Sequence, residues 1–420
     1  MANIVSYIES DQRTFSESPL NPVDSLVLST LSYFNYEATG LVGSPSAERV
    51  LLHDILALSD WSVLCCANWL EDAKETPRFL HALMASRRYR STTVAFYVNE
   101  VSDVVEKQFS AVTFFLPASA GNGEETAYLG FRGTDGSFAG WKEDFNLCFK
   151  DIIPSQQAAA AYVSGVASAC ACPLVLGGHS KGGNLAEYAA SVVDESLYSR
   201  ISGIFNHDGP SFLGDPSPRM GQPHFSSLLH KTVPESSAFG MILERREDYR
   251  VVQSTALSVF QHEPFSWKVA GSDFLYQGSL NPSAAFFDSA LDTWLRGKTT
   301  AERERFIDTI YDLFVSTEAN TWGEFQEKLF ANMRILLGTG SKLDPETKRF
   351  VGQTLGSLAG VVRDETIRRM RPSPRAFLAR RRSAYESCGP HQNAPSDSAQ
   401  GARTANNIGK ETPSHGRSHN

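Results

Sequence analysis

Apolar residues recur at helical spacing over the first part of the chain. The run DSLVLSTLSY at residues 24–33 predicts a short amphipathic helix. Asp24 is its expected N-cap, because a short acidic side chain before an apolar run accepts hydrogen bonds from the first backbone N–H groups. The same spacing predicts further helices at residues 47–58 and across most of residues 61–84.

Strand patterns take over after residue 90. Three runs rich in β-branched and aromatic residues lie at 92–98, 110–117 and 126–133. The ASAGNGEE break at 118–125 between the last two predicts a hairpin turn.

Helices and continuous apolar strands then alternate. The helices are expected at 156–169 and 184–193, and the strands at 173–178, 201–206 and 249–254. Continuous apolar strands separated by helices are typical of βαβ units. The predicted fold class is therefore α/β, with a mostly parallel central sheet flanked by helices.

The pattern changes twice more toward the C-terminus. Residues 282–370 are mostly amphipathic helix, with the last helix expected at 345–370. We expect residues 1–281 to form the main domain with its N-terminal helices, and residues 282–370 to pack on it or cap it. Residues 371–420 have too few apolar side chains to offset the entropy of ordering, so a disordered tail is expected there.

The charge balance narrows the classes of partner. The chain carries 39 basic and 47 acidic residues, a net charge of −8. Residues 371–420 contain eight Lys or Arg and three Asp or Glu, a net charge of +5, so residues 1–370 carry a net charge of −13. A body that acidic argues against a nucleic-acid groove, which needs a basic stripe to neutralise phosphates. The basic run at 380–382 is either a contact for anionic surfaces or RNA, or simply part of a solvated tail.

Cysteine usage and the start of the chain suggest a compartment. None of the six cysteines forms a C-x-x-C pair, and no His, Cys or Glu cluster has ligand spacing, so we expect no metal and no cofactor. The opening MANIVSYIESDQRTF has no basic start and no apolar run, and no later apolar stretch has the length of a bilayer span. The expectation is a cytoplasmic protein with reduced thiols and no transmembrane segment.

A Gly-rich turn between a predicted strand and a predicted helix carries the first candidate chemistry. Gly178, Ser180 and Gly182 match the pattern G-x-S-x-G. In a nucleophile elbow the serine lies on a strained strand-to-helix turn, where side chains two residues to either side would collide. Small residues at 183, 186, 189 and 190 let the following helix pack close to the sheet. Ser180 is thus a candidate nucleophile, and a structural Gly-rich turn is the alternative.

A general base is needed downstream of Ser180. Seven histidines follow it, at 207, 224, 230, 262, 391, 415 and 419. The last three lie in the expected tail, His207 adjoins its own strand, and the next two are expected in a loop or short helix. His262 follows the run VVQSTALSVF, where the last strand would deliver a loop back over the turn. It is the candidate base, with a structural hydrogen-bonding role as the alternative.

The acid has two candidates. Asp208 follows the strand after the Ser180 helix, where a carboxylate could reach an imidazole and fix its tautomer. Glu235, in HKTVPESS, is the rival. We favour Asp208 over Glu235, because Asp208 stands at the end of the strand that follows the Ser180 helix, whereas Glu235 follows a short apolar segment further along the chain.

An oxyanion would need two backbone N–H donors near the nucleophile. The N–H of Lys181 comes with the elbow itself. The second is expected from FRGTD, where a strand stops at Gly133 and Thr134 presents its amide. A plain strand-terminating turn is the alternative reading.

These motifs together resemble known families. FRGTD, WKED and GHSKGGN resemble the class 3 lipases, the fungal triacylglycerol type, which carry FRGT before the lid region and GHSLGG at the nucleophile. GHSKGGNLAEYAA, FNHDGPSF, VPESSAFGMIL and QHEPFSW, with the N-terminal DSLVLSTLSYFNYE, more closely resemble a bacterial family of Mbeg-like proteins with an α/β-hydrolase-like fold. The resemblance covers about residues 24–370. It implies Ser180 as nucleophile, Asp208 or a residue of the PESS segment as acid, and His262 as base, and it implies no substrate.

Lys181 departs from the lipase pattern, which has leucine there. A cation beside the nucleophile would favour an anionic substrate or product, or pair with an acid such as Glu187, and would make a greasy acyl groove less suitable. Our main hypothesis is a serine hydrolase that cleaves an ester or thioester of a small-molecule or lipid-like acyl substrate through an acyl-enzyme on Ser180. The alternative is a hydrolase-fold binding or scaffold protein without turnover.

Overall fold

The computed structural model describes residues 2–43, 45–65, 75–102, 104–118, 123–134, 138–147, 149–237, 239–315, 345, 348–349 and 352–353. All of these fall in one unit of the chain, residues 1–368. The predicted tail at 371–420 and almost all of the helix predicted at 345–370 lie outside the described residues.

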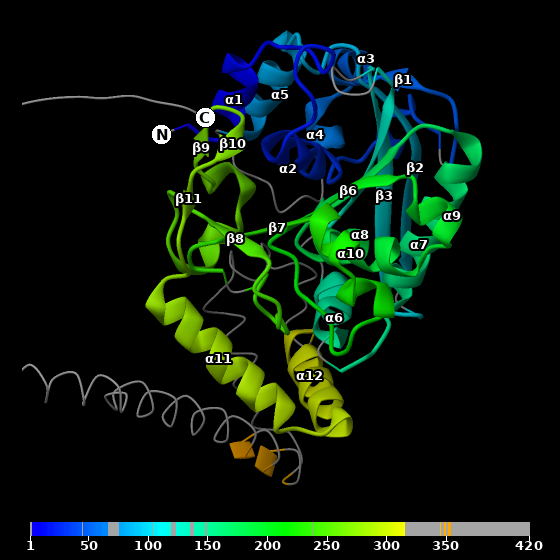
Figure 1. The fold of residues 1–420 in the computed structure, drawn as a ribbon. Helices are drawn as coiled ribbons and strands as arrows, with labels where there is room; N and C mark the ends of the chain where they lie inside the picture. The colour runs from blue at the N-terminus through cyan, green and yellow to red at the C-terminus, as the bar shows by residue number, and fades with distance from the viewer. Residues whose placement is uncertain are drawn as a thin grey trace, which may run out of the picture. The chain divides into compact units, whose positions relative to one another are not determined.

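A nine-stranded mixed sheet forms the centre of the described structure (Figure 1). In sheet order its strands are β1 (Val50–Leu51), β2 (Thr93–Ser102), β3 (Lys107–Leu116), β4 (Thr126–Phe131), β5 (Leu174–His179), β6 (Ile201–His207), β7 (Leu229–Pro234), β8 (Tyr249–Val252) and β11 (Tyr276–Gln277). Strands β4 to β8 run parallel, whereas β1 to β4 pair antiparallel and β11 pairs antiparallel with β8. The α/β prediction and the β3–β4 hairpin are confirmed, and the parallel part is the centre of the sheet.

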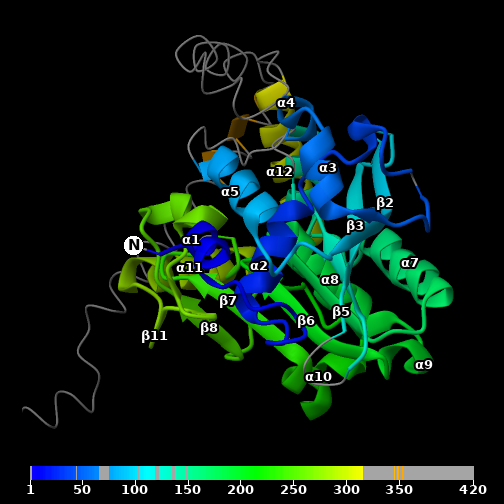
Figure 2. The ribbon, with the colours of Figure 1, turned by 90° about the horizontal axis from the view of Figure 1, so that it is seen from above.

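Helices cover both faces of the sheet. On one face lie α1 (Ile4–Ser10), α2 (Pro22–Leu31) and α5 (Glu75–Ala85); on the other lie α7 (Pro154–Ala169) and α8 (Lys181–Val192). Figure 2 shows α2 and α7 on opposite sides of the strands. Side chains alternate accordingly along β5, since Val175 joins the core beneath α2 while Leu174 and Leu176 join the core beneath α8.

The remaining elements are short or lie outside the sheet. They are α3 (Leu52–Leu58), α4 (Trp61–Leu64), α6 (Phe138–Asn146), α9 (Glu195–Tyr198), α10 (Pro223–Leu228), α11 (Pro282–Arg296), α12 (Thr300–Val315), the 3-10 helices Glu37–Thr39, Pro218–Gly221, Ser258–His262 and Pro264–Ser266, and the two-stranded sheet β9 (Val269–Ala270) and β10 (Asp273–Phe274). Among the described residues, no helix combines the length and the apolar character that crossing a bilayer requires.

Three local predictions need correction. The N-cap of α2 is Asn21, and Asp24 is the third helical residue of a capping box, because its carboxylate accepts from the Asn21 N–H while the Asn21 side chain caps the helix. Residues 50–51 form β1, since they pair with β2, and the helix begins only at Leu52. His230 lies in β7, a strand that the sequence pattern did not reveal.

Candidate active site

Ser180 occupies the turn between β5 and α8 in a conformation that non-glycine residues rarely adopt. Its φ is 58° and its ψ is −134°, outside the regions that L-residues favour. The backbone holds it there, because the Ser180 N–H donates to the His207 carbonyl at 2.9 Å and the Ser180 carbonyl accepts from the Gly183 N–H at 2.9 Å. The side chain is therefore presented at the carboxyl end of β5.

The two motif glycines are needed because the backbone passes very close to them. A Cβ at position 178 would lie 2.2 Å from the carbonyl carbon of Gly182, and a Cβ at position 182 would lie 2.1 Å from the carbonyl oxygen of Phe131. Both neighbours are main-chain atoms that cannot rotate away. The spacing around Ser180 thus has a direct steric cause.

We expect Gly182→Ala to destabilise the fold by about 3 kcal/mol or more, because its methyl group must push α8 away from β4. Gly165→Ala is the matched control: Gly165 lies inside α7 with no atom near the added Cβ, so helix propensity should stabilise the fold by about 0.5–1 kcal/mol. Urea unfolding measures both. Equal midpoints for the two variants would contradict the steric account.

Asp208 and His262 lie against each other although 54 residues separate them. The Nδ1 of His262 is 2.6 Å from Oδ2 of Asp208, whose side chain is fully buried. The other oxygen, Oδ1, accepts from the Ser237 hydroxyl at 2.5 Å and from the Gly240 N–H at 3.1 Å. Asp208 directly follows β6 with a φ of 55°, so a turn and three donors orient this carboxylate.

Glu235, the rival acid, lies elsewhere. Its Oε1 accepts from the Gln261 amide at 3.3 Å. Within the described residues Glu235 makes no hydrogen bond or ion pair with His262. The PESS segment contributes instead through Ser237, which holds Asp208.

His179, the residue before Ser180, contacts His262. The rings of His179 and His262 lie against each other with centroids 4.4 Å apart, and Nε2 of His179 lies 2.8 Å from the His262 carbonyl oxygen. Across the described residues no hydrogen bond joins the Ser180 hydroxyl to His262. Such bonds are often long in a free enzyme and tighten when substrate is present.

The sequence pattern did not predict the roles of His179 and Tyr33. Burial lowers the pKa of His179 well below its usual range, so its ring is neutral. A carbonyl oxygen only accepts, which places the ring proton on Nε2; Nδ1 then accepts from the Tyr33 hydroxyl at 3.1 Å. A histidine inside the serine motif was the available signal. Nothing local to Tyr33, 146 residues earlier, marked it.

The loop after β4 runs beside Ser180. A Cβ at Gly133 would lie 3.0 Å from the Ser180 Cβ. Next along the chain, the Thr134 hydroxyl donates to Oδ2 of Asp144 on α6, and burial raises the pKa of Asp144 to about 6. In the part of the chain that the structure describes, the backbone N–H of Thr134 has no acceptor. The N–H of Lys181 is the first of α8 and so lacks an intrahelical partner.

The Lys181 side chain does not lie where a cation could meet a substrate. Its Nζ is fully buried, 2.9 Å from Oε2 of Glu143. Lys181 thus pairs with an acid, as one of the two alternatives expected, but the acid is not Glu187, whose carboxylate binds Arg246 and the Asn206 amide. Lys181 therefore gives no reason to expect an anionic substrate.

Of the other histidines, His207 is structural. Its Nε2 contacts the Ser25 hydroxyl at 2.9 Å and its Nδ1 contacts the Thr232 hydroxyl at 2.8 Å. Burial lowers its pKa to about 3, so the ring stays neutral and holds α2 to the sheet.

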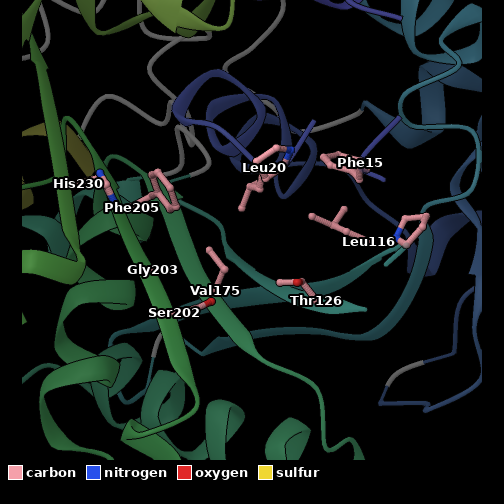
Figure 3. A pocket seen from close by; sticks show the side chains of 11 residues that line it. Phe15, Leu20, Leu116, Thr126, Val175, Ser202, Gly203, Phe205 and His230 are labelled. Atoms are coloured by element: carbon pink, nitrogen blue, oxygen red, sulfur yellow. The ribbon is translucent and has the colours of Figure 1, made fainter. Parts of the chain in front are cut away.

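A cavity of about 340 Å³ lies at the opposite edge of the sheet (Figure 3). Val175 and Gly203 line it from the amino ends of β5 and β6, with Leu116 at the end of β3 and Phe15 and Leu20 from the N-terminal segment. The candidate nucleophile lies at the carboxyl end of β5, so this cavity is not part of the candidate site.

Comparison with known proteins places the chain in a family. A family model described as Mbeg1-like matches residues 83–312. The chain belongs to the Mbeg1-like family. A search of the curated proteins and a search of the solved structures each found no match.

The Mbeg1-like match spans every candidate site residue from Thr134 to His262. It is shorter than the resemblance expected for residues 24–370, since it begins within α5 and ends within α12. The N-terminal helices and the loop that carry Asp24 and Tyr33 lie before it.

Proposed function

We propose that this chain is a serine hydrolase of the α/β-hydrolase type that cleaves an ester or thioester bond through an acyl-enzyme on Ser180. The contact between the buried Asp208 carboxylate and Nδ1 of His262 is the observation that carries the proposal. A carboxylate on this nitrogen orients an imidazole so that its other nitrogen can exchange a proton with a nucleophile.

The order of elements supports the α/β-hydrolase assignment. Ser180 follows β5, Asp208 follows β6, and His262 follows the last parallel strand, β8. This is the chain order Ser, acid, His of that fold. The positive φ of Ser180 and the close approach at Gly178 and Gly182 are the steric marks of its nucleophile turn.

The proposed reaction uses these groups in two steps. The Ser180 Oγ attacks the acyl carbon while Nε2 of His262 takes the hydroxyl proton. The amides of Thr134 and Lys181 hold the resulting oxyanion, aided by the positive end of the α8 dipole. His262 then gives its proton to the leaving alcohol or thiol, which departs as the acyl-enzyme forms. Water attacks the acyl-enzyme by the same route in reverse, with His262 as base, and releases the acid.

Labelling of the native full-length chain by a fluorophosphonate probe tests the proposal. We expect one covalent adduct, which peptide mass spectrometry assigns to Ser180, and no adduct in Ser180→Ala. Ser211→Ala is the matched control. Ser211 is a buried serine like Ser180 and lies three residues after Asp208, but it has no role in the proposed reaction. Folded wild-type protein that stays unlabelled would overturn the proposal and leave the binding or scaffold protein as the alternative.

A further inference from the structure

Lys181 is an unusual residue to bury beside a nucleophile, and its contacts are directional. Besides Glu143, the Nζ donates to the Gln108 carbonyl at 3.1 Å and to Oε1 of the Gln108 side chain at 2.9 Å. All three ammonium donors therefore have an acceptor. Oδ1 of Asp144 lies 3.8 Å from the same nitrogen.

Glu143, on α6, connects this ammonium to two further elements, β3 and α7. Its carboxylate accepts from the Gln108 N–H on β3 at 3.0 Å. It also accepts from the Ser155 N–H at 3.1 Å and the Ser155 hydroxyl at 2.8 Å, at the start of α7. The pair Lys181–Glu143 thus ties α6 to β3, α7 and α8 at one point.

The same helix α6 carries the contacts that hold the Thr134 loop. Asp144, the neighbour of Glu143, accepts from the Thr134 hydroxyl. A Cβ at Gly140 would lie 2.5 Å from Oε1 of Gln108 and 2.8 Å from the Thr134 methyl group, so α6 lies tightly between these two side chains. A shift of α6 would move Thr134 relative to Ser180.

Stability alone does not account for the pair. Removing two charges from water is expensive, and apolar residues of similar volume often serve a fold as well as or better than a buried ion pair. Apolar packing does not fix the direction of a contact. The Lys181 ammonium does, because its three acceptors, on Gln108 of β3 and Glu143 of α6, fix the position of α6 relative to β3.

We propose that Lys181, through Glu143 and Gln108, is a positioning residue that sets α6 and thereby the Thr134 amide of the oxyanion site. This inference rests on the proposed function. Lys181 has two roles in this proposal. Its backbone N–H is one oxyanion donor, and its side chain fixes the loop that carries the second donor, the Thr134 N–H.

The charges around Asp144 supply a readout that loss of packing would not change. The groups that face this carboxylate are Lys181 from α8, Glu143 from its own helix, Thr134 and His262. Lys181 lowers the pKa of Asp144 and Glu143 raises it, and the effect of Lys181 is the larger. Because protonated Asp144 is a weaker acceptor for the Thr134 hydroxyl, its protonation should slow labelling in addition to the loss of the unprotonated His262 that acts as base. The acid limb, the pH range in which labelling slows, should therefore move when this pKa moves.

The experiment measures the fluorophosphonate labelling rate of the full-length chain against pH. Lys181→Met should slow labelling at neutral pH by about 10²-fold, the scale of a 1 Å misplacement, and move the acid limb to higher pH. Glu143→Gln should move the limb to lower pH. The double variant removes the Lys181 and Glu143 charges together, so it avoids the unpaired Glu143 carboxylate that Lys181→Met leaves, and its limb should move to higher pH.

A second buried Lys–Glu pair provides the control. Lys231 on β7 binds Glu244 with both side chains almost fully buried, and in the described structure neither side chain forms a hydrogen bond or ion pair with a residue of α6. Lys231→Met with Glu244→Gln should leave the limb unmoved. If the wild type is labelled but the limb does not move in the Lys181 and double variants, this inference is wrong while the proposed function stands. An unlabelled wild type overturns both.

Discussion

Asp208→Asn is expected to slow labelling of Ser180 by about 10⁴-fold, the scale seen when a triad acid becomes an amide. The Ser237 hydroxyl and the Gly240 N–H both donate to Oδ1 of Asp208. They would keep the oxygen of the new amide on their side, so its NH₂ group would face Nδ1 of His262. The ring proton would then move to Nε2, where it prevents His262 from accepting the proton of Ser180.

Glu235→Gln is the paired measurement, and we expect its labelling rate to stay within about twofold of wild type, because glutamine keeps the oxygen that accepts from the Gln261 amide. Its carboxylate contacts Gln261 and not the His262 ring. Labelling that slows in Glu235→Gln but not in Asp208→Asn would show that the acid has been assigned to the wrong residue. Circular dichroism of both variants checks that the fold is intact.

The second large effect is on stability, in the N-terminal helices. Arg88→Met is expected to lower the free energy of unfolding by about 3–5 kcal/mol, because it leaves the Asp24 carboxylate buried without its cation. The pair is bidentate, with both side chains fully buried and nitrogen–oxygen distances of 2.7 and 2.5 Å. The hydroxyls of Tyr7 and Tyr89 also donate to Asp24, so the loss would loosen the helices around it.

Arg78→Met is the matched control in the same region. Arg78 pairs with Glu9, and each side chain is 43% exposed, so water replaces the lost contact and the expected cost is below about 1 kcal/mol. Urea unfolding of both variants decides the matter. A cost for Arg88→Met no larger than that for Arg78→Met would show that the Asp24 network is not a main support of the fold.

The central strands could be predicted because each is a continuous apolar run bounded by turn residues. Strand β7 could not. Its sequence LHKTVP contains Lys231, whose charge is neutralised by Glu244 from a loop 13 residues away, and a pattern of polar and apolar letters does not show that pairing. Asp24 was misplaced for a local reason, since Asn21, three residues earlier, is the N-cap and forms a capping box with Asp24.

Some features of the candidate site were likewise visible in the local sequence, and others depend on residues far apart in the chain. Glycines at 178 and 182 are a local steric requirement, so the turn at Ser180 was visible in the sequence. Choosing between two downstream carboxylates depends on which one meets His262, and only the folded chain brings Asp208 there. The direction of the Lys181 side chain likewise depends on Glu143, 38 residues earlier.

The hydrogen bond from Tyr33 to His179 has a practical consequence for anyone who shortens this protein. A fragment cut at the ends of the family match would keep residues 83–312, with Ser180, Asp208 and His262 all present. It would lack Tyr33, and the partner of Arg88 would be gone. One whole face of the sheet would lose its helical cover. Expression boundaries for this protein are better placed before Asn3, which caps the first helix, than at the limits of sequence similarity.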